Sequence, residues 1–452
     1  MGPTLLTAAA CGEECFSGLY AVTITANALF LTVCGWSVLL LTRGMDRAGR
    51  ALALIAMGTA VLVWLGYPAD WGGAIISPSA GGLRFLPLAM LTALILTAER
   101  TDTARLSGCL LSTGHALWLL GLAWSPEAGF FTTLLWWPWL ALRRADAAGS
   151  RTAAWAALLR GGLIGVGAVL AGLAALALLF RVVFGDWVAP GDYVLYLLFP
   201  PGRLPINPYG PVWFIAAVLL LGLTGLWQAS AGPARRKLYV CLLAALATTS
   251  YYVSRSFDNN LFNLLPALIL LLLAIQAARQ TDFSAGFLRA TLAAIIALPV
   301  AFHFHSFAAL PGASSVAGLQ LGPAPVLARL SPAPDQHGLL VAEDAANALA
   351  DLRSSGASAV MLIDEKMVMP AANPAESWSG VNNAANFVPL PPEVIRRYVV
   401  AGAKRFGRAG WIVVANKDAP RWLDLFAAAY DPAEQRRYGA YTAYRMVPRN
   451  AH

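Results

Sequence analysis

Charged residues are scarce in this sequence. Lys, Arg, Asp and Glu together make up 12% of the 452 residues, whereas hydrophobic residues make up 58%. A soluble domain usually carries about a quarter charged residues, and the deficit here is concentrated in the first three hundred residues. Lipid, unlike water, stabilises such a stretch as a set of separate helices. The composition therefore predicts that most of the chain is embedded in a membrane.

Patterns typical of metal and phosphate sites are also missing. The five cysteines are scattered without the spacing of a zinc site. His303 and His305 lie two residues apart, so on a helix they would point to different sides. The C-terminal region contains no glycine-rich phosphate loop. We predict no metal site and no certain cofactor, with a divalent cation between Asp258 and Glu127 as the open alternative.

The basic residues predict an orientation in the membrane. The formal net charge is +8, but Lys and Arg cluster in short loops between apolar stretches, as in cytoplasmic loops of membrane proteins. This placement argues against a nucleic-acid partner. Trp and Tyr gather in the opposite loops, as at a membrane–water interface. We therefore expect a multi-pass protein of the bacterial cytoplasmic (inner) membrane, with both termini on the periplasmic side.

The apolar stretches predict about ten transmembrane helices. A spanning helix needs about 20 apolar residues, because each residue rises roughly 1.5 Å across a core about 30 Å thick. The expected fold is an all-α polytopic membrane bundle over residues 1–310. The expected spans are 17–42, 51–67, 84–98, 107–124, 127–142, 159–182, 211–229, 238–253, 261–278 and 287–308.

The composition changes after Leu310. Residues 311–336 are rich in Pro, Ser and Ala, which is typical of a linker. From 337 to 452, short hydrophobic runs alternate with helical patterns, which predicts a small α/β extracytoplasmic domain of two or three layers. The expected strands are 337–342, 359–364, 410–416 and 436–448, and the expected helices are 343–356, 391–407 and 419–430.

Polar residues at the outer ends of spans are the candidates for chemistry, because burying them against lipid is costly unless they are paired or used. The segment 251–260, Tyr-Tyr-Val-Ser-Arg-Ser-Phe-Asp-Asn-Asn, ends the eighth span. Its arginine can bind a phosphate with a planar fork of donors. The alternative is that its Asp and Asn residues only cap the next helix.

Two further outer segments carry isolated charges. In the turn 124–127, Glu127 suits the positive end of the following helix, which by itself explains its presence. Arg84 enters the third span from the outer side, against the positive-inside bias, after two glycines that permit a tight backbone near a ligand. Asp70 is the acid of the same loop, and Trp71 follows it.

Two loops combine aromatic and polar residues, as sugar-binding sites do. One is 185–210, for which a membrane interface is the alternative, and the other is 378–387, for which a turn-rich loop with Asn–backbone bonds is the alternative. The residues expected to contact the acceptor or a sugar are Trp71, Tyr209, Trp378, Asn382 and Asn383.

Taken together, the outer-facing spans, the Ser-Pro-Glu turn at 125–127, the Arg-Ser-Phe-Asp-Asn-Asn segment at 255–260 and the C-terminal exterior domain resemble the integral-membrane GT-C glycosyltransferases over residues 17–308. The resemblance implies transfer of a sugar from a polyprenyl-phosphate donor to a cell-envelope glycan or lipid acceptor on the outer face. It implies a carboxylate base, for which Asp70 and Glu127 are the candidates. The residues expected to hold the donor phosphate are Arg84, Arg203, Arg255, Asp258, Asn259 and Asn260.

The chain departs from that family in one respect. The family places a catalytic acid in its first outer loop, whereas only Glu13 and Glu14 precede the first span here. Either the sequence lacks an N-terminal span with its catalytic loop, or the base lies elsewhere, as at Asp70. The alternative functions are a transporter or flippase of a lipid-linked sugar, and a non-catalytic membrane scaffold whose C-terminal domain binds a glycan or a partner.

Overall fold

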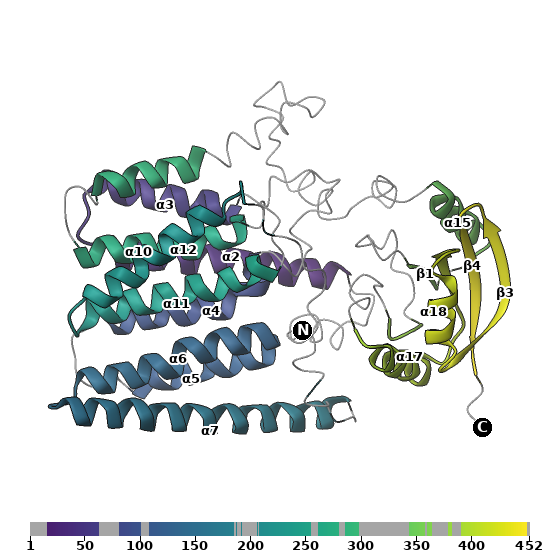
Figure 1. The fold of residues 1–452 in the computed structure, drawn as a ribbon, viewed down its shortest axis with the longest axis horizontal. Helices are drawn as coiled ribbons and strands as arrows, with labels where there is room; N and C mark the ends of the chain where they lie inside the picture. The colour runs from purple at the N-terminus through teal and green to yellow at the C-terminus, as the bar shows by residue number, and fades with distance from the viewer. Residues whose placement is uncertain are drawn as a thin grey trace. The chain divides into compact units, whose positions relative to one another are not determined.

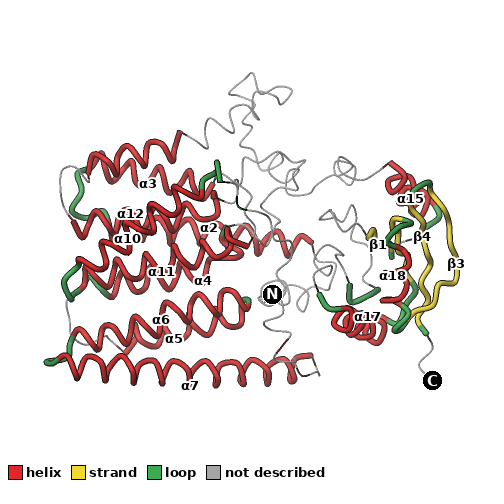
Figure 2. Tube along the Cα trace, viewed as in Figure 1, coloured by secondary structure: helices red, strands yellow, loops and turns green. Residues whose placement is uncertain are grey.

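The chain forms two compact units in the computed structural model. One unit, here the helical unit, holds the described residues up to 297, and the other, here the C-terminal unit, holds residues 343–449. All the described strands belong to the C-terminal unit (Figure 2). The structure describes residues 16–62, 81–100, 108–184, 187, 191, 206, 208–254, 261–279, 285–297, 343–357, 359–363, 378–381 and 390–449.

Every span expected from the sequence contains a helix in the structure. Helix α7 is longer than the expected span 159–182, and α3 begins before residue 51. The helices are α2 (Phe16–Leu41), α3 (Arg47–Leu62), α4 (Gly82–Ala98), α5 (Gly108–Trp124), α6 (Pro126–Asp146), α7 (Arg151–Phe184), α10 (Val212–Gln228), α11 (Pro233–Ser254), α12 (Leu261–Arg279) and an unlabelled helix Ala285–Ala297.

Three of the described helices are long and apolar enough to cross a membrane: Ala21–Leu41, Arg151–Val182 and Leu261–Ala278. The expectation of about ten spans is therefore not confirmed. Helices α4, α5 and α10 are apolar but have 17 residues each, which at 1.5 Å per residue gives about 25 Å, short of a core about 30 Å thick. Others, such as α6 and α11, carry several charges near one end.

Helix α7 is the strongest indication of a lipid environment. It lies along the outside of the bundle beside α5 and α6 (Figure 1), and only 11% of its most apolar window is buried. Its exposed side chains include Leu163, Leu170 and Val182, each more than 60% exposed. Soluble proteins rarely leave a continuous apolar surface of that size in water, whereas a bilayer covers it without cost.

Helix α4 lies at the centre of the helical unit and packs on α2, α5, α6 and α11. It runs parallel to α2, because Asn27 contacts Gly82 at one end and Trp36 donates a hydrogen bond to Thr97 Oγ1 (3.2 Å) at the other. Leu91 and Ile95 of α4 are fully buried. The first turns of α4 and α6 thus share one end of the bundle with the last turn of α11.

The C-terminal unit is built on a four-stranded sheet of order β1-β2-β4-β3. β1 and β2 are parallel, and the other neighbours are antiparallel. The elements are α15 (Glu343–Ser354), β1 (Val360–Ile363), α17 (Pro392–Phe406), β2 (Gly410–Ala415), α18 (Ala419–Phe426), β3 (Tyr430–Tyr438) and β4 (Tyr441–Pro448).

Helices cover both faces of this sheet, as expected for three layers. Alternation along β2 points Ile412 and Val414 toward α17 and α18, and Trp411 and Val413 toward α15. Helix α17 ends at Gly407 in the left-handed conformation (φ 61°), as its sequence predicts.

The single terminal strand expected at 436–448 is wrong. The chain forms a hairpin instead, in which β3 and β4 pair around a turn at Gly439 (φ 53°). A glycine with positive φ between two strand patterns is a hairpin signal. β3 is the edge strand, which explains how it accommodates Pro432 beside a register shift.

Candidate functional site

The first turn of α4 is fixed against α2. The Gly82 N–H donates a hydrogen bond to Asn27 Oδ1 (2.8 Å), and a Cβ at Gly82 would lie 2.4 Å from the carbonyl oxygen of Ala26. Gly81 has a φ of 55°, which only glycine adopts readily. The two glycines therefore allow close packing of α4 on α2, and their predicted approach to a ligand stays a prediction.

This turn presents Arg84 to α6 and α11. Arg84 Nε and Nη2 lie 2.8 Å and 2.6 Å from Glu127 Oε2, and the guanidinium carbon lies 4.0 Å from the ring centroid of Tyr251. Arg84 Nη1 is buried and has no hydrogen-bond partner among the residues that the structure describes. We call Arg84, Glu127 and Tyr251 the Arg84 cluster.

The corner between α5 and α6 places Glu127 by local interactions. Ser125 Oγ accepts a hydrogen bond from the backbone N–H of Ala128 (3.1 Å), and Pro126 occupies the first helical position. Trp124 Nε1 donates to the carbonyl oxygen of Leu83 (2.6 Å) and so ties this corner to α4. The helix-start interpretation of the segment is confirmed, and the contact with Arg84 adds to it.

The Arg84 cluster joins parts of three segments that the sequence analysis treated separately. Arg84 and Glu127 are 43 residues apart in the chain, and Tyr251 opens the segment 251–260. Because Arg84 Nε donates a hydrogen bond to Glu127 Oε2 and Nη2 forms an ion pair with the same oxygen, the carboxylate holds the guanidinium in place. Glu127 is 42% exposed and Arg84 16% exposed, so the cluster is open to solvent on the Glu127 side. The arrangement suits anion binding by a positioned cation.

Most other predicted site residues fall outside the described part of the chain and stay predictions. Tyr209 is described: it lies just before α10 and is 96% exposed, as an interface or ligand-contacting residue would be. The predicted residues outside the described ranges are Asp70, Trp71, Arg203, Arg255, Asp258, Asn259, Asn260, Asn382 and Asn383.

The expectation that Trp378 contacts a sugar is wrong. Its side chain is 3% exposed and packs against Phe426 and Tyr430, with ring centroids 5.6 Å and 5.2 Å away. Its carbonyl oxygen accepts a hydrogen bond from the Tyr430 hydroxyl (2.5 Å). Burial with these two rings makes Trp378 a core residue of the C-terminal unit.

Sequence analysis missed a buried ionic network at the other end of α4. Glu99, whose side chain is fully buried, accepts hydrogen bonds from Arg236 Nε (2.9 Å) and Nη2 (2.7 Å), from Arg143 Nη1 (3.1 Å) and from Trp139 Nε1 (2.9 Å). Arg236 also binds Asp146 (2.8 Å). The sequence signal that could have revealed this network is Glu99, an acidic residue among the basic residues at this end of the spans. We call Glu99, Asp146, Arg143, Arg235 and Arg236 the Glu99 network.

No group of three His, Cys, Asp or Glu side chains forms a metal site within the residues that the structure describes. Asp258 lies outside them, so the alternative of a cation between Asp258 and Glu127 stays a prediction. Comparison with protein-family models, curated proteins and solved structures finds no match for this chain.

Proposed function

We propose that this chain is a membrane glycosyltransferase of the GT-C type, which transfers a sugar from a polyprenyl-phosphate donor to a cell-envelope acceptor. The observation that supports the proposal is the Arg84 cluster. It holds a guanidinium, fixed by a carboxylate and an aromatic ring, at one end of a bundle that includes three helices capable of crossing a membrane. A lipid-anchored phosphate reaches that position from the bilayer.

The chemistry assigns separate roles to these groups. The bond between the sugar C1 and the phosphate oxygen breaks, and negative charge develops on the departing polyprenyl phosphate. Arg84, whose side chain is 16% exposed, would stabilise that charge through its guanidinium, while Glu127 keeps the guanidinium oriented. A carboxylate must take the proton from the attacking acceptor hydroxyl. Because Glu127 is engaged by Arg84, we assign this role to Asp70.

The placement of the charges supports an orientation of the protein in the membrane. The Glu99 network and its neighbouring basic residues lie at the opposite end of α4 from Arg84. If the basic end faces the cytoplasm, the Arg84 cluster faces the periplasm of a bacterial inner membrane.

The same placement argues against a transporter. In the described helices of the helical unit, every Asp, Glu, Lys and Arg except Arg160 lies within five residues of a helix end, and Arg160 is the tenth residue of α7. Substrate and ion paths of transporters place such residues near the bilayer midplane.

The test is binding and transfer in membranes that contain the full chain. Decaprenyl phosphate should raise the melting temperature of the purified protein, whereas decaprenol, which lacks the phosphate, should not. Arg84→Gln should abolish that shift and lower sugar transfer from labelled polyprenyl-phosphate sugars about 10- to 100-fold, the usual cost of losing hydrogen bonds to a charged group.

Arg181→Gln is the matched control. It removes an arginine from the last turn of α7, at the same end of the bundle but outside the Arg84 cluster. Transfer should stay within about twofold of the wild type in this variant. Equal transfer by the Arg84→Gln and Arg181→Gln proteins would remove Arg84 from the site, and the absence of transfer from every polyprenyl-phosphate sugar in the wild type would refute the proposed function.

A further inference from the structure

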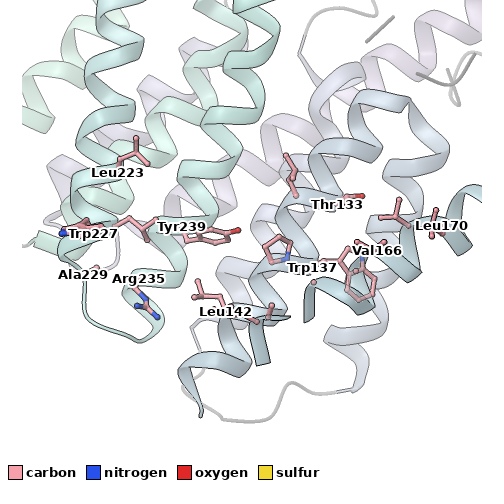
Figure 3. A pocket seen from close by; sticks show the side chains of 18 residues that line it. Thr133, Trp137, Leu142, Val166, Leu170, Leu223, Trp227, Ala229, Arg235 and Tyr239 are labelled. Atoms are coloured by element: carbon pink, nitrogen blue, oxygen red, sulfur yellow. The ribbon is translucent and has the colours of Figure 1, made fainter. Parts of the chain in front are cut away.

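An apolar groove of about 820 Å³ opens between the α6–α7 pair and the α10–α11 pair (Figure 3). The two pairs face each other across it, and α6 and α11 close its floor, because these two helices pack directly. Most lining side chains are aliphatic or aromatic, and Arg235 and Tyr239 of α11 are the polar exceptions of note. Representative apolar residues are Trp137, Leu142, Val166, Leu170, Leu223 and Trp227.

Gly162 of α7 lines the groove and adds no side chain to it. Gly165 also lines it, but there the missing side chain allows Trp137 of α6 to pack closely, because a Cβ would lie 3.0 Å from Trp137 Cβ. A Cβ built on Gly162 would have no heavy atom within 4 Å, so this position faces empty space. The groove is therefore wide enough for a hydrocarbon chain to lie against the backbone of α7.

The groove faces the surroundings of the bundle. Val166, Leu170 and Leu223 are 60%, 63% and 47% exposed, and Trp227, at the end of α10, is 91% exposed. Two of these residues belong to α7, one of the helices long and apolar enough to span a membrane. In a bilayer, lipid chains are the molecules that fill such a surface.

Arg235 gives one end of the groove a charge preference. Its Nη2 pairs with Asp146, and its Nε is buried and has no hydrogen-bond partner within the described part of the chain. The ends of α6, α7 and α11 around it carry six basic residues and one acidic residue. They are Arg143, Arg144, Asp146, Arg151, Arg235, Arg236 and Lys237.

We propose that this groove binds one anionic glycerophospholipid, with an acyl chain along α7 and the phosphate at Arg235. An anionic headgroup is attracted to basic residues at the membrane surface, and Arg235, which lines the groove and is 28% exposed, supplies a guanidinium for a phosphate oxygen. The site is separate from the Arg84 cluster, which lies at the opposite ends of α6 and α11, and does not depend on the proposed function.

The test is native mass spectrometry of the full chain released from detergent with equal amounts of dioleoylphosphatidylglycerol and dioleoylphosphatidylcholine. We expect about fivefold higher occupancy by phosphatidylglycerol, the value that corresponds to one basic residue near the membrane surface. Arg235→Gln should remove this preference. Arg144→Gln, which deletes the same charge from an exposed side chain outside the groove, should retain it.

Two glycines of α7 provide a matched pair for the acyl chain. Gly162→Leu fills the groove, whereas Gly167→Leu adds the same side chain at a position that is equally open but does not line it. Only Gly162→Leu should lower the occupancy by both lipids. If Gly162→Leu fails to fold, the position of the acyl chain can be tested with phosphatidylglycerol that carries a brominated acyl chain. Bromine quenches tryptophan fluorescence, and we expect less quenching in Trp227→Phe than in the wild type.

Three results would overturn the proposal. Equal occupancy by the two lipids would exclude the charge preference. An effect of Arg235→Gln no larger than that of Arg144→Gln would exclude the phosphate position. Lipid binding that is the same in the Gly162→Leu and Gly167→Leu proteins, or unchanged quenching in Trp227→Phe, would place the chain elsewhere.

Discussion

Replacing Glu99 by Gln tests how much the Glu99 network contributes to stability. The side chain of Glu99 is fully buried, and those of Arg236 and Arg143 are 9% and 11% exposed. Glutamine keeps the size of the side chain but removes the carboxylate that Arg143 and Arg236 share, while Asp146 still pairs with Arg236. Breaking a buried ion pair by removing one partner costs about 3–5 kcal/mol, and because Asp146 remains we expect a loss at the lower end of that range, about 3 kcal/mol.

The matched control is Asp46→Asn, which breaks the ion pair between Asp46 and Arg289 (2.9 Å). These two side chains are 53% and 50% exposed. An exposed pair contributes about 0–1 kcal/mol, because water already screens both charges. The same chemical change should therefore have a much smaller effect at position 46 than at position 99.

The measurement is the free energy of unfolding of the purified protein, from titration of mixed micelles with sodium dodecyl sulfate and detection by circular dichroism. A double variant, Glu99→Gln with Arg236→Gln, should lose less than the sum of the two single changes, because each single change already removes the contact between Glu99 and Arg236. If Glu99→Gln costs no more than Asp46→Asn, the reasoning about burial in this network is refuted.

Three further predictions concern packing and pH. Tyr430→Phe should lower stability by about 1–3 kcal/mol, because the buried carbonyl of Trp378 loses its donor. Burial raises the pKa of Tyr430 to about 12, so the stability of the wild type should also fall as pH rises from 10 to 12. Thermal melts should show that this loss is smaller in the variant. The hydrogen bond from the Tyr438 hydroxyl lowers the pKa of Asp351. The ionised Asp351 therefore stabilises the fold above its unfolded pKa, and this stabilisation is lost as pH falls through its folded pKa. Melts of Asp351→Asn at pH 2–6 should lack this acid dependence. Gly121→Ala should lower the free energy of unfolding by about 1–3 kcal/mol, because its Cβ would lie 2.3 Å from a side-chain oxygen of α6. Gly108→Ala, whose Cβ would have nothing within 4 Å, should not destabilise the protein. Equal melting temperatures for these two variants would contradict the packing argument.

The positions of the elements followed from the sequence because local interactions determine them. Apolar length located the helices, a short hydrophobic run located β2, and single residues set helix ends, such as Ser125 before α6 and Gly407 after α17. The hairpin of β3 and β4 was missed although its signal, Gly439, is local. The sequence did not predict how many helices are long and apolar enough to cross a membrane, because that depends on where each helix ends and on the charges near its ends.

Contacts between distant residues were decided by the tertiary structure. The sequence marked Arg84 and Glu127 as candidates, but only helix packing shows that they bind each other across 43 residues. Trp378 looked like a ligand-contacting residue because its neighbours are polar, whereas the fold buries it.

The sequence by itself therefore determined the positions of the apolar helices, the placement of charges near helix ends and most elements of the C-terminal unit, since these depend on residues within a few turns of one another. The tertiary structure decided which charges are paired, which aromatic residues are buried and where the groove beside Arg235 opens. Those features depend on which helix faces come together, and a pattern along the chain does not specify that choice.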